Sequence, residues 1–294
     1  GIFRGTLGSL KVPTPEQMSA YTKQAYECSP LKADQSVVGN SRSTDNPIPA
    51  KVGDPSPIKH CIYIVKENRT YDQIFGDLRQ GNGDPDLCIF PARVTPNHHA
   101  LVEEFVLLDN FYVESEVSAD GHEWSMAAYA TDFVEKTWPL TYRGGQGKLS
   151  YPSEGKLPIA FPSGGYIWDR CREAGVSYRS YGEFIENPKV IGQPATTKVK
   201  TLEGHFDPYF HGYDLDYTDQ KRADRFIEEL HRFEKEGGFP QFTVMRLPND
   251  HTSGTRVGKP TPTAMVADND LALGQIVEAV KLAAAEAVAE VEHV

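Results

Sequence analysis

The chain has 294 residues, with 41 acidic against 30 basic side chains and a formal net charge of −11. Domains that hold nucleic acid by its phosphates normally carry a basic surface, so this balance argues against a nucleic-acid partner. It does not exclude a phosphate-ester substrate, because a bound divalent cation reverses the local field inside an acidic protein. No apolar run approaches the ~20 residues that a membrane-spanning helix needs, so no transmembrane segment is expected.

Residues 1–57 are expected to form an N-terminal arm outside the core. A short amphipathic helix is predicted over residues 15–26, after Thr14 as its cap. Residues 29–57 are rich in Ser, Asn, Asp, Pro and Gly, a composition typical of loops. The first residues show no basic segment followed by an apolar one, so no signal peptide is expected within this sequence.

The cysteines are widely spaced and form no CxxC pair, which does not support a zinc finger. Two interpretations are open, namely buried free thiols and, in an exported protein, one or two disulfides. The residues concerned are Cys28, Cys61, Cys88 and Cys171.

Four apolar runs predict strands of a central sheet. They cover residues 61–65, 106–113, 176–181 and 240–247. Continuous β-branched runs of this kind are typical of parallel strands buried on both faces. We therefore expect residues 61–65 to form a central strand, with Leu107, Leu108 and residues 242–245 in neighbouring strands.

Segments with helical spacing separate these runs. Helices are predicted over residues 71–76, 96–105, 123–133, 166–174, 219–235 and 263–280. The alternation predicts an α/β fold, a three-layer sandwich whose central sheet is mainly parallel. Its domain is expected to span residues 58–280. The Ala-rich, helix-prone tail over residues 281–294 reads as low-complexity or vector-derived sequence and receives no functional role.

Polar clusters follow three of the predicted strands. Because the carboxyl ends of parallel strands share one edge of the sheet, segments nearly 200 residues apart are expected to converge in one cleft. The clusters contain Glu67 and Asn68, then Ser118 and His122, and finally Asp250 and His251.

These side chains suit the chemistry of a phosphate ester. Carboxylates, amide oxygens and imidazoles bind hard divalent cations, so Glu67, Asn68, Asp250 and His251 are candidate ligands for Zn, Mn, Ca or Mg. Such a cation neutralises phosphate oxygens and lowers the pKa of a hydroxyl nucleophile. Ser118 lies just before a predicted helix, whose backbone N–H groups and positive dipole end favour a phosphate.

Each candidate also has a structural interpretation. Glu67 and Asn68 suit a solvated turn, and Ser118 suits a helix cap. Thr70 is a rival nucleophile and substrate ligand, although capping of the following helix explains it as well. His205 belongs to a polar loop that either lines the pocket or is solvated, and both interpretations are open. His98 and His99, by contrast, are expected to be structural.

Three segments carry a resemblance to a known family. Residues 62–76 (IYIVKENRTYDQIFG) resemble the Glu-Asn-Arg-Ser/Thr-Phe/Tyr-Asp…Phe-Gly opening motif of the phosphoesterase family. This family groups bacterial phospholipases C with certain acid phosphatases in the alkaline-phosphatase superfamily. Residues 118–124 are similar to the segment in which a Ser or Thr nucleophile precedes a His by four positions. Residues 247–252 resemble a later segment of the same cleft, and the similarity covers residues 58–280.

The resemblance implies a metal-dependent phosphoester hydrolase. Glu67 and Asn68 would bind metal and phosphate, Ser118 would be transiently phosphorylated, and Asp250 with His251 would complete the metal ligands. His122 would be catalytic, and Asn68, Thr70 and His205 would bind substrate, a small-molecule or lipid phosphate ester. The N-terminal arm looks like the end of a β-propeller that precedes this domain in a related subgroup. A longer protein outside the cytoplasm, periplasmic, secreted or on the cell surface, is then expected.

One departure from the family pattern leaves an alternative open. Family members carry a further acidic and histidine cluster ending Asp-His-Val after the last predicted helix, where this chain has its Ala-rich tail. Weak or no activity is therefore expected for this chain. The alternative function is a non-catalytic surface or binding module that keeps the phosphoesterase fold. A sulfatase is disfavoured, because no Cys/Ser-x-Pro-x-Arg pattern occurs.

Overall fold

The computed structural model describes residues 7–28, 47–49, 54–115, 117–141, 151 and 154–292, with side chains described up to residue 285. The chain divides into two units, Gly1–Lys59 and His60–Val294. Most of the loop expected over residues 29–57 lies outside the described residues.

The first unit contains helix α1 (Pro15–Cys28), none of whose residues is buried. Thr14 and Gln17 form a reciprocal cap at its start. The Gln17 N–H donates to Thr14 Oγ1 at 3.3 Å, and the Thr14 N–H donates to Gln17 Oε1 at 3.0 Å. These bonds satisfy two of the N–H groups that a helix start leaves without partners, so the predicted helix with its Thr14 cap is confirmed.

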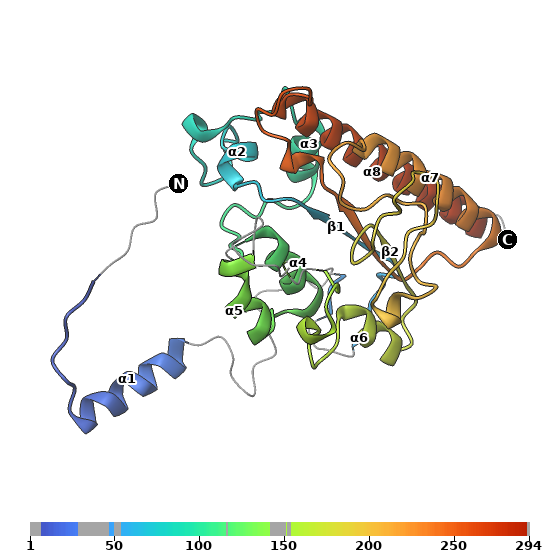
Figure 1. Ribbon diagram of the computed structural model, residues 1–294. Helices are drawn as coiled ribbons and strands as arrows, with labels where there is room; N and C mark the ends of the chain where they lie inside the picture. The colour runs from blue at the N-terminus through green and yellow to red at the C-terminus, as the bar shows by residue number, and fades with distance from the viewer. Residues whose placement is uncertain are drawn as a thin grey trace. The chain divides into compact units, whose positions relative to one another are not determined.

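The second unit is a mixed α/β structure around a small parallel sheet (Figure 1). Its strands are β1 (Cys61–Lys66), β2 (Tyr178–Tyr181) and β3 (Phe242–Leu247), in the order β1-β3-β2. Phe242 at the start of β3 pairs with Cys61 on one side and with Tyr178 on the other. All strands therefore run in the same direction, and their carboxyl ends meet at one edge.

Two predictions about this sheet are wrong. Residues 61–65 form an edge strand rather than a central one, and Cys61 and Tyr63 are exposed. Residues 106–113 form no strand, because the chain turns at Asp109 and Asn110. These two side chains bond to Asn82, with the Asn82 N–H donating to Asp109 Oδ2 at 2.9 Å, and so interrupt the extended run. The apolar residues 105, 106, 108 and 111–113 are exposed as a result.

Helices separate the strands, but α2 to α6 all lie between β1 and β2 because the strand predicted over residues 106–113 is absent. The α-helices are α2 (Tyr71–Phe75), α3 (Pro96–Glu104), α4 (Ser118–Ala127), α5 (Asp132–Thr141), α6 (Ile167–Glu173), α7 (Asp219–Glu236) and α8 (Pro262–Glu292). Short 3₁₀ turns are η1 (Pro85–Leu87), η2 (Pro158–Ala160), η3 (Lys200–Leu202) and η4 (Asn249–His251).

The helix predicted over residues 123–133 is divided between α4 and α5. Ala128 ends α4 in the left-handed conformation, with φ of 61°, while its N–H still donates to the Trp124 carbonyl. A left-handed residue stops the regular pattern of helical hydrogen bonds, so α5 begins as a separate helix. The last helix also runs beyond residue 280, because the Ala-rich segment continues it to Glu292.

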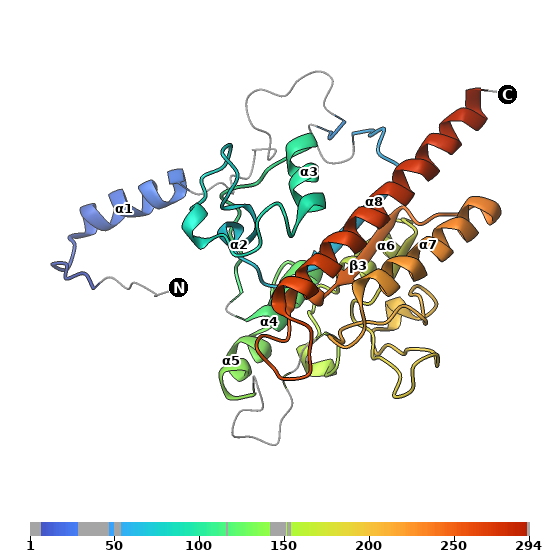
Figure 2. The same ribbon diagram turned by 90° about the horizontal axis from the view of Figure 1, so that it is seen from above.

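The strong predicted helix over residues 219–235 is confirmed. Thr218 caps α7 by accepting the Lys221 N–H, and Gly237, with φ of 76°, ends it. Its buried face includes Ala223, Phe226 and Leu230. Figures 1 and 2 both show α7 and α8 lying side by side.

The sheet has an apolar core on each face. One core joins Val65, Val244 and Tyr178 to α4 and α6 through Met126 and Trp168. The other joins strand residues to α7 and α8, and its buried members are Tyr181, Phe210, Ala223, Phe226, Leu230, Met245, Leu247, Ala272, Leu273 and Ile276. Side chains alternate between the faces of a strand, so neighbouring residues of β3 serve opposite cores.

All four cysteines lie in described parts of the chain and are free thiols. Cys171 is buried, Cys88 is half-buried, and Cys28 and Cys61 are exposed. None of the described helices is both long and apolar enough to cross a membrane.

Candidate functional site

A cluster of buried charges lies where the parallel strands end. Glu67 follows β1, Glu183 follows β2, and Arg246 is the next-to-last residue of β3. Arg246 Nη2 lies 3.0 Å from Glu67 Oε1, although the two residues are 179 positions apart in the sequence. The three residues are 8%, 0% and 3% exposed, so this edge of the sheet is polar and closed to bulk water.

The guanidinium group of Arg246 is surrounded by carboxyl groups. Its Nη1 donates to Glu154 Oε2 at 2.7 Å, and its Nε lies 3.6 Å from Glu183 Oε1. The second distance is too long for a hydrogen bond. Arg246 Nε and Glu183 Oε1 are accordingly buried without a hydrogen-bond partner in the described part of the chain. Arg246 therefore offsets part of the charge of Glu67, Glu154 and Glu183 without satisfying every donor and acceptor.

Helix α4 adds His122 to this cluster. Its Nδ1 lies 3.1 Å from Glu183 Oε2, and its Nε2 lies 3.5 Å from Glu67 Oε1. Burial by itself would lower the pKa of His122, but Glu183 and Glu67 outweigh burial and raise it to about 10. The ring donates from Nδ1 to Glu183, whereas Nε2 is paired with Glu67 at a distance too long for a hydrogen bond. Arg246 Nη2 also lies 3.0 Å from His122 Nε2, and Glu67 contacts both groups.

These cations also act on Glu67. Burial by itself would raise the pKa of Glu67, but the contact with His122 and the charge of Arg246 lower it to about 2. The cluster thus contains three carboxyl groups against two cations, and Glu67 is ionised at neutral pH.

Asp250, on the turn η4, reaches the same edge from β3. The Glu67 N–H donates to Asp250 Oδ1 at 3.2 Å. Arg69 fastens the two segments, because its Nε and Nη2 donate to the carbonyls of Asp250 and His251, both at 2.7 Å. Burial raises the pKa of Asp250, against the opposing charge of Lys66.

The structure brings some of the predicted site residues together. Glu67, His122 and Asp250 are connected by direct contacts. Ser118 is the first residue of α4, one helical turn before His122. Residues four apart on a helix lie on the same face, so Ser118 and His122 share one.

Other predicted site residues lie apart from this cluster. Asn68 is exposed. Thr70 caps α2 in a reciprocal box with Gln73. His205 is exposed and stacks on Tyr178 at a ring distance of 4.5 Å, at the amino end of β2 and therefore at the opposite end of the strands. His98 and His99 make the structural contacts expected of them, His98 with Asp270 at 2.5 Å and His99 with Asp77 at 2.8 Å.

The four predicted metal ligands have suitable donor atoms but do not surround one point. Glu67 faces Arg246, Asp250 accepts a backbone N–H, the ring of His251 faces Tyr213, and Asn68 is exposed. Among the residues that the structure describes, no group of three or more His, Cys, Asp or Glu is arranged to hold a metal ion. In this arrangement the guanidinium of Arg246 already lies between the carboxylates, so the residues do not fit a metal ion as they stand.

Three members of the cluster were not predicted from the sequence. Arg246 is a charged residue inside an otherwise apolar strand, which is a visible signal. Glu183 follows the run over residues 176–181 and obeys the same strand-end rule that identified Glu67 and Asp250. Glu154 lies in a long irregular connection, and no sequence pattern marks it.

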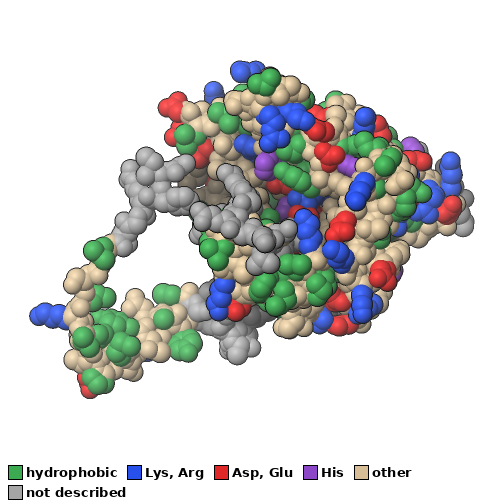
Figure 3. Space-filling view, viewed as in Figure 1, with side chains coloured by type: hydrophobic (Ala, Val, Ile, Leu, Met, Phe, Trp, Pro, Cys, Tyr) green, Lys and Arg blue, Asp and Glu red, His purple; other side chains and the backbone are tan. Residues whose placement is uncertain are grey.

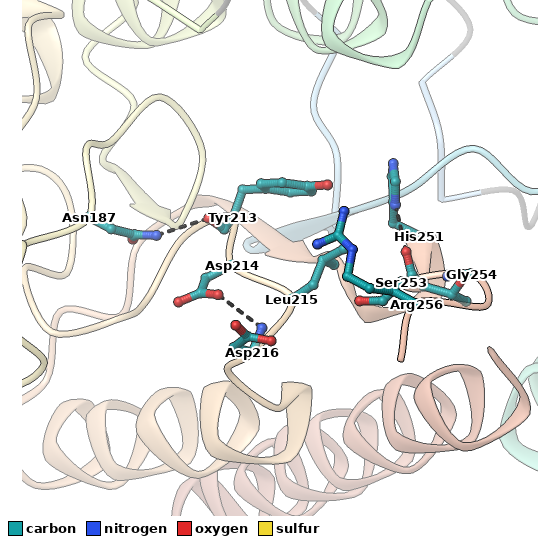
Figure 4. A pocket seen from close by; sticks show the side chains of 10 residues that line it. Asn187, Tyr213, Asp214, Leu215, Asp216, His251, Ser253, Gly254 and Arg256 are labelled. Carbon is teal, nitrogen blue, oxygen red and sulfur yellow. Dashed lines mark hydrogen bonds between the residues drawn. The ribbon is translucent and has the colours of Figure 1, made fainter. Parts of the chain in front are cut away.

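A pocket of about 710 Å³ opens beside the cluster (Figure 4). Three segments supply its lining residues, which are Asn187, Tyr213, Asp214, Leu215, Asp216, His251, Thr252, Ser253, Gly254 and Arg256. Tyr213 connects the pocket to the cluster. The guanidinium of Arg246 lies 4.8 Å from the centre of its ring, and the ring of His251 meets it edge-on at 5.8 Å. On the face drawn in Figure 3, acidic and basic side chains of the described residues are interspersed.

No model of a known protein family matches the sequence, and no characterised protein is detectably similar to it.

Proposed function

We propose that this chain is the phosphoester hydrolase domain that its motifs suggest, acting through a Ser nucleophile. One observation supports the proposal most strongly. Glu67 contacts both Asp250 and His122, so the three motif segments meet at the carboxyl edge of the sheet. Sites of parallel α/β proteins lie at this edge.

In the proposed reaction, Ser118 Oγ attacks the phosphorus of the ester. The bond from phosphorus to the alcohol oxygen breaks, and the alcohol leaves with the proton that the Ser118 hydroxyl gives up. Water later cleaves the Ser118 phosphoester, which releases the phosphate group and restores the hydroxyl. Ser118 begins a helix of ten residues, whose first N–H groups and positive dipole end stabilise the phosphoryl oxygens.

His122 is proposed to hold Glu67 and Glu183 in place rather than to act as a general base. A general base must be unprotonated at the working pH, whereas Glu183 and Glu67 hold the pKa of His122 at about 10. As an imidazolium it fixes Glu67 and Glu183 and adds positive charge near the start of α4. Activation of the Ser118 hydroxyl must then come from elsewhere.

A divalent cation, Zn, Mn, Ca or Mg, is proposed as the cofactor on the strength of the motif resemblance. Glu67, Asn68, Asp250 and His251 carry the oxygen and nitrogen donors that it prefers. Because they do not converge in this arrangement, no step of the reaction is assigned to it.

The substrate class is proposed to be a small-molecule or lipid phosphate ester, and the protein is proposed to act outside the cytoplasm. A preceding β-propeller and a complete three-layer sandwich belong to the same proposal. The cores on both faces of the small sheet support the layered arrangement.

A second candidate is a non-catalytic binding module with the same fold. Arg246 favours it, because this arginine neutralises Glu67 and Glu154 from within the chain. Carboxylates that already have cationic partners within the chain have less need of an external cation.

Turnover separates the two candidates. Chromogenic phosphate mono- and diesters are incubated with the protein, with and without each of the four metal ions. We expect weak metal-stimulated turnover that Ser118→Ala abolishes. Ser125→Ala is the matched control, because Ser125 lies on the same helix and its hydroxyl only donates to the Gly121 carbonyl at 2.7 Å. No turnover under any condition favours the binding module, and full activity in Ser118→Ala removes Ser118 from the mechanism.

A further inference from the structure

The pocket beside the charged cluster has the size of a small-molecule site. Its volume of about 710 Å³ lies within the range of roughly 300–1,000 Å³ typical of ligand pockets. Its walls come from the loop around Tyr213, from Asn187 and from the segment that directly follows η4. Distant segments thus build one concave surface in a single unit of the chain.

The hydrogen-bond donors of this pocket include a free cation. Arg256 is exposed, and no carboxylate within the described ranges pairs with it. In Figure 4 its guanidinium group extends between Tyr213 and His251. A guanidinium group offers five N–H donors in a planar fork, a shape that matches carboxylate and phosphate groups.

His251 presents a defined nitrogen to the pocket. Its Nδ1 lies 2.9 Å from the Thr252 carbonyl oxygen, which can only accept, so the proton is on Nδ1. Nε2 is left without a protein partner in the described part of the chain, and it is placed to accept a hydrogen bond from a ligand.

The backbone beside His251 is strained. Thr252 has φ of 63° and ψ of 162°, a region occupied almost only by glycine. β-Branched residues are rarely held in this conformation, and residues that are concentrate at functional sites.

The acidic side chains of the pocket are already engaged. Asp214 accepts from His211 Nε2 at 3.0 Å and from the Asp216 N–H at 2.9 Å. Asp216 pairs with Lys259 at 2.5 Å. The positive charge of Arg256 therefore has no counterpart among the described lining residues, which favours an anionic ligand.

Tyr213 gives the pocket a flat apolar wall in a fixed position. Asn187 Nδ2 donates to the Tyr213 carbonyl at 3.0 Å, and the guanidinium of Arg246 covers the ring at 4.8 Å. Aromatic surfaces of this kind stack on flat ligand groups.

We propose that this pocket binds a small organic anion, a carboxylate or phosphonate-type group held by Arg256 and carried on a flat apolar body that packs on Tyr213. The site goes beyond the proposed hydrolysis and does not depend on it, because binding requires no turnover.

Titration calorimetry with phenylphosphonate tests the proposal, since this probe has both features and cannot be hydrolysed as an ester. We expect Arg256→Gln to weaken binding about tenfold, the loss typical of one charge-assisted hydrogen bond. Arg256→Lys keeps the charge but not the fork, and we expect a loss of about threefold. The matched control is Arg79→Gln, which removes another exposed arginine without an ion pair in the described residues, and its affinity is expected to equal that of the wild type.

Two results overturn the proposal. One is equal affinity in the wild type and in Arg256→Gln, and the other is no binding by the wild type at about 10 mM probe, beyond the range of a useful site. Benzyl alcohol, a neutral probe of similar shape, is expected to bind without dependence on Arg256. Binding that requires Arg256 in a protein without esterase turnover supports the pocket and counts against the proposed hydrolysis. Ester turnover without Arg256-dependent binding supports the proposed hydrolysis and counts against the proposed pocket.

Discussion

Arg222 and Arg246, the two arginines found buried among the described residues of the second unit, are bound in different ways. Arg222, on α7, is 0% exposed and donates five hydrogen bonds. Four go to the carbonyls of residues 211, 212, 214 and 217, and one goes to Asp219 at 2.9 Å. Arg246, on β3, is 3% exposed and lies among three carboxyl groups, with its Nε unsatisfied.

Arg222 therefore stabilises the fold mainly through hydrogen bonds, whereas Arg246 does so mainly through its charge. Arg222 uses all five donors of its guanidinium group, mainly on neutral carbonyls, and so fixes the loop that carries Tyr213 into the pocket. Arg246 compensates carboxylates that could not otherwise be buried. The pKa values change in opposite directions as well. Burial lowers the pKa of Arg222, whereas around Arg246 the effect of burial is outweighed by Glu154, Glu183 and Glu67, which raise it.

The largest effect is expected for Arg246→Met. This change leaves Glu67, Glu154 and Glu183 buried without their arginine, and losing one partner of a buried ion pair costs about 3–5 kcal/mol of unfolding free energy. Urea denaturation at pH 7 measures the loss. Arg246→Lys retains the charge and is expected to recover more than half of it.

The reverse pattern is expected at Arg222. A lysine ammonium has three donors, so Arg222→Lys leaves at least two of the five acceptors unpaired and costs about 2–3 kcal/mol in the same denaturation measurement. A lysine is therefore expected to preserve most of the unfolding free energy at position 246 but not at position 222. Equal rescue by lysine at both positions would contradict the distinction between the two arginines.

Glu123 tests how burial changes the pKa of a carboxyl group beside Glu154, one of the partners of Arg246. Its Oε1 accepts the Glu154 N–H at 2.9 Å, and burial raises its pKa to about 7. Because the folded-state pKa lies above the usual value of 4.5, its favourable contribution is complete below pH 4.5 and is lost as the pH rises through 7. Glu123→Gln is expected to remove this decline and to gain about 2 kcal/mol relative to the wild type at pH 8. Parallel stability curves for the two proteins from pH 4 to pH 8 would rule out the raised pKa.

A smaller effect is expected at the strained Thr252. Thr252→Gly relieves the backbone, whereas Thr252→Ala retains the strained Cβ, and both variants lose the hydroxyl that accepts the Gly254 N–H at 3.3 Å. The glycine variant should therefore be more stable than the alanine variant by about 1 kcal/mol, the reverse of the usual order. Thermal denaturation measures the difference in stability between the two variants. A more stable alanine variant would show that Thr252 is not strained.

Much of the fold follows from local sequence patterns. The strands at residues 61–66, 178–181 and 242–247 are apolar runs, and the caps at Thr70 and Thr218 follow from short polar patterns. The error over residues 106–113 has a physical cause, because local bonds of Asp109 and Asn110 to Asn82 outweigh the strand propensity of the run.

The candidate site is less predictable. The strand-end rule identified Glu67 and Asp250, and applied to β2 it would have identified Glu183. It could not identify Glu154, which reaches Arg246 from an irregular connection. Nor could it show that the protein supplies its own cation, since the placement of Arg246 between the carboxylates depends on tertiary packing.

The most direct test of the proposed function is to locate the transferred phosphoryl group. The protein is incubated with a chromogenic phosphate ester, quenched in acid, digested and examined by mass spectrometry. The proposal predicts one phosphorylated peptide, modified at Ser118 and absent from the Ser118→Ala variant. A phosphoryl group on Thr70, or ester turnover in which Ser118 is never phosphorylated, would contradict it.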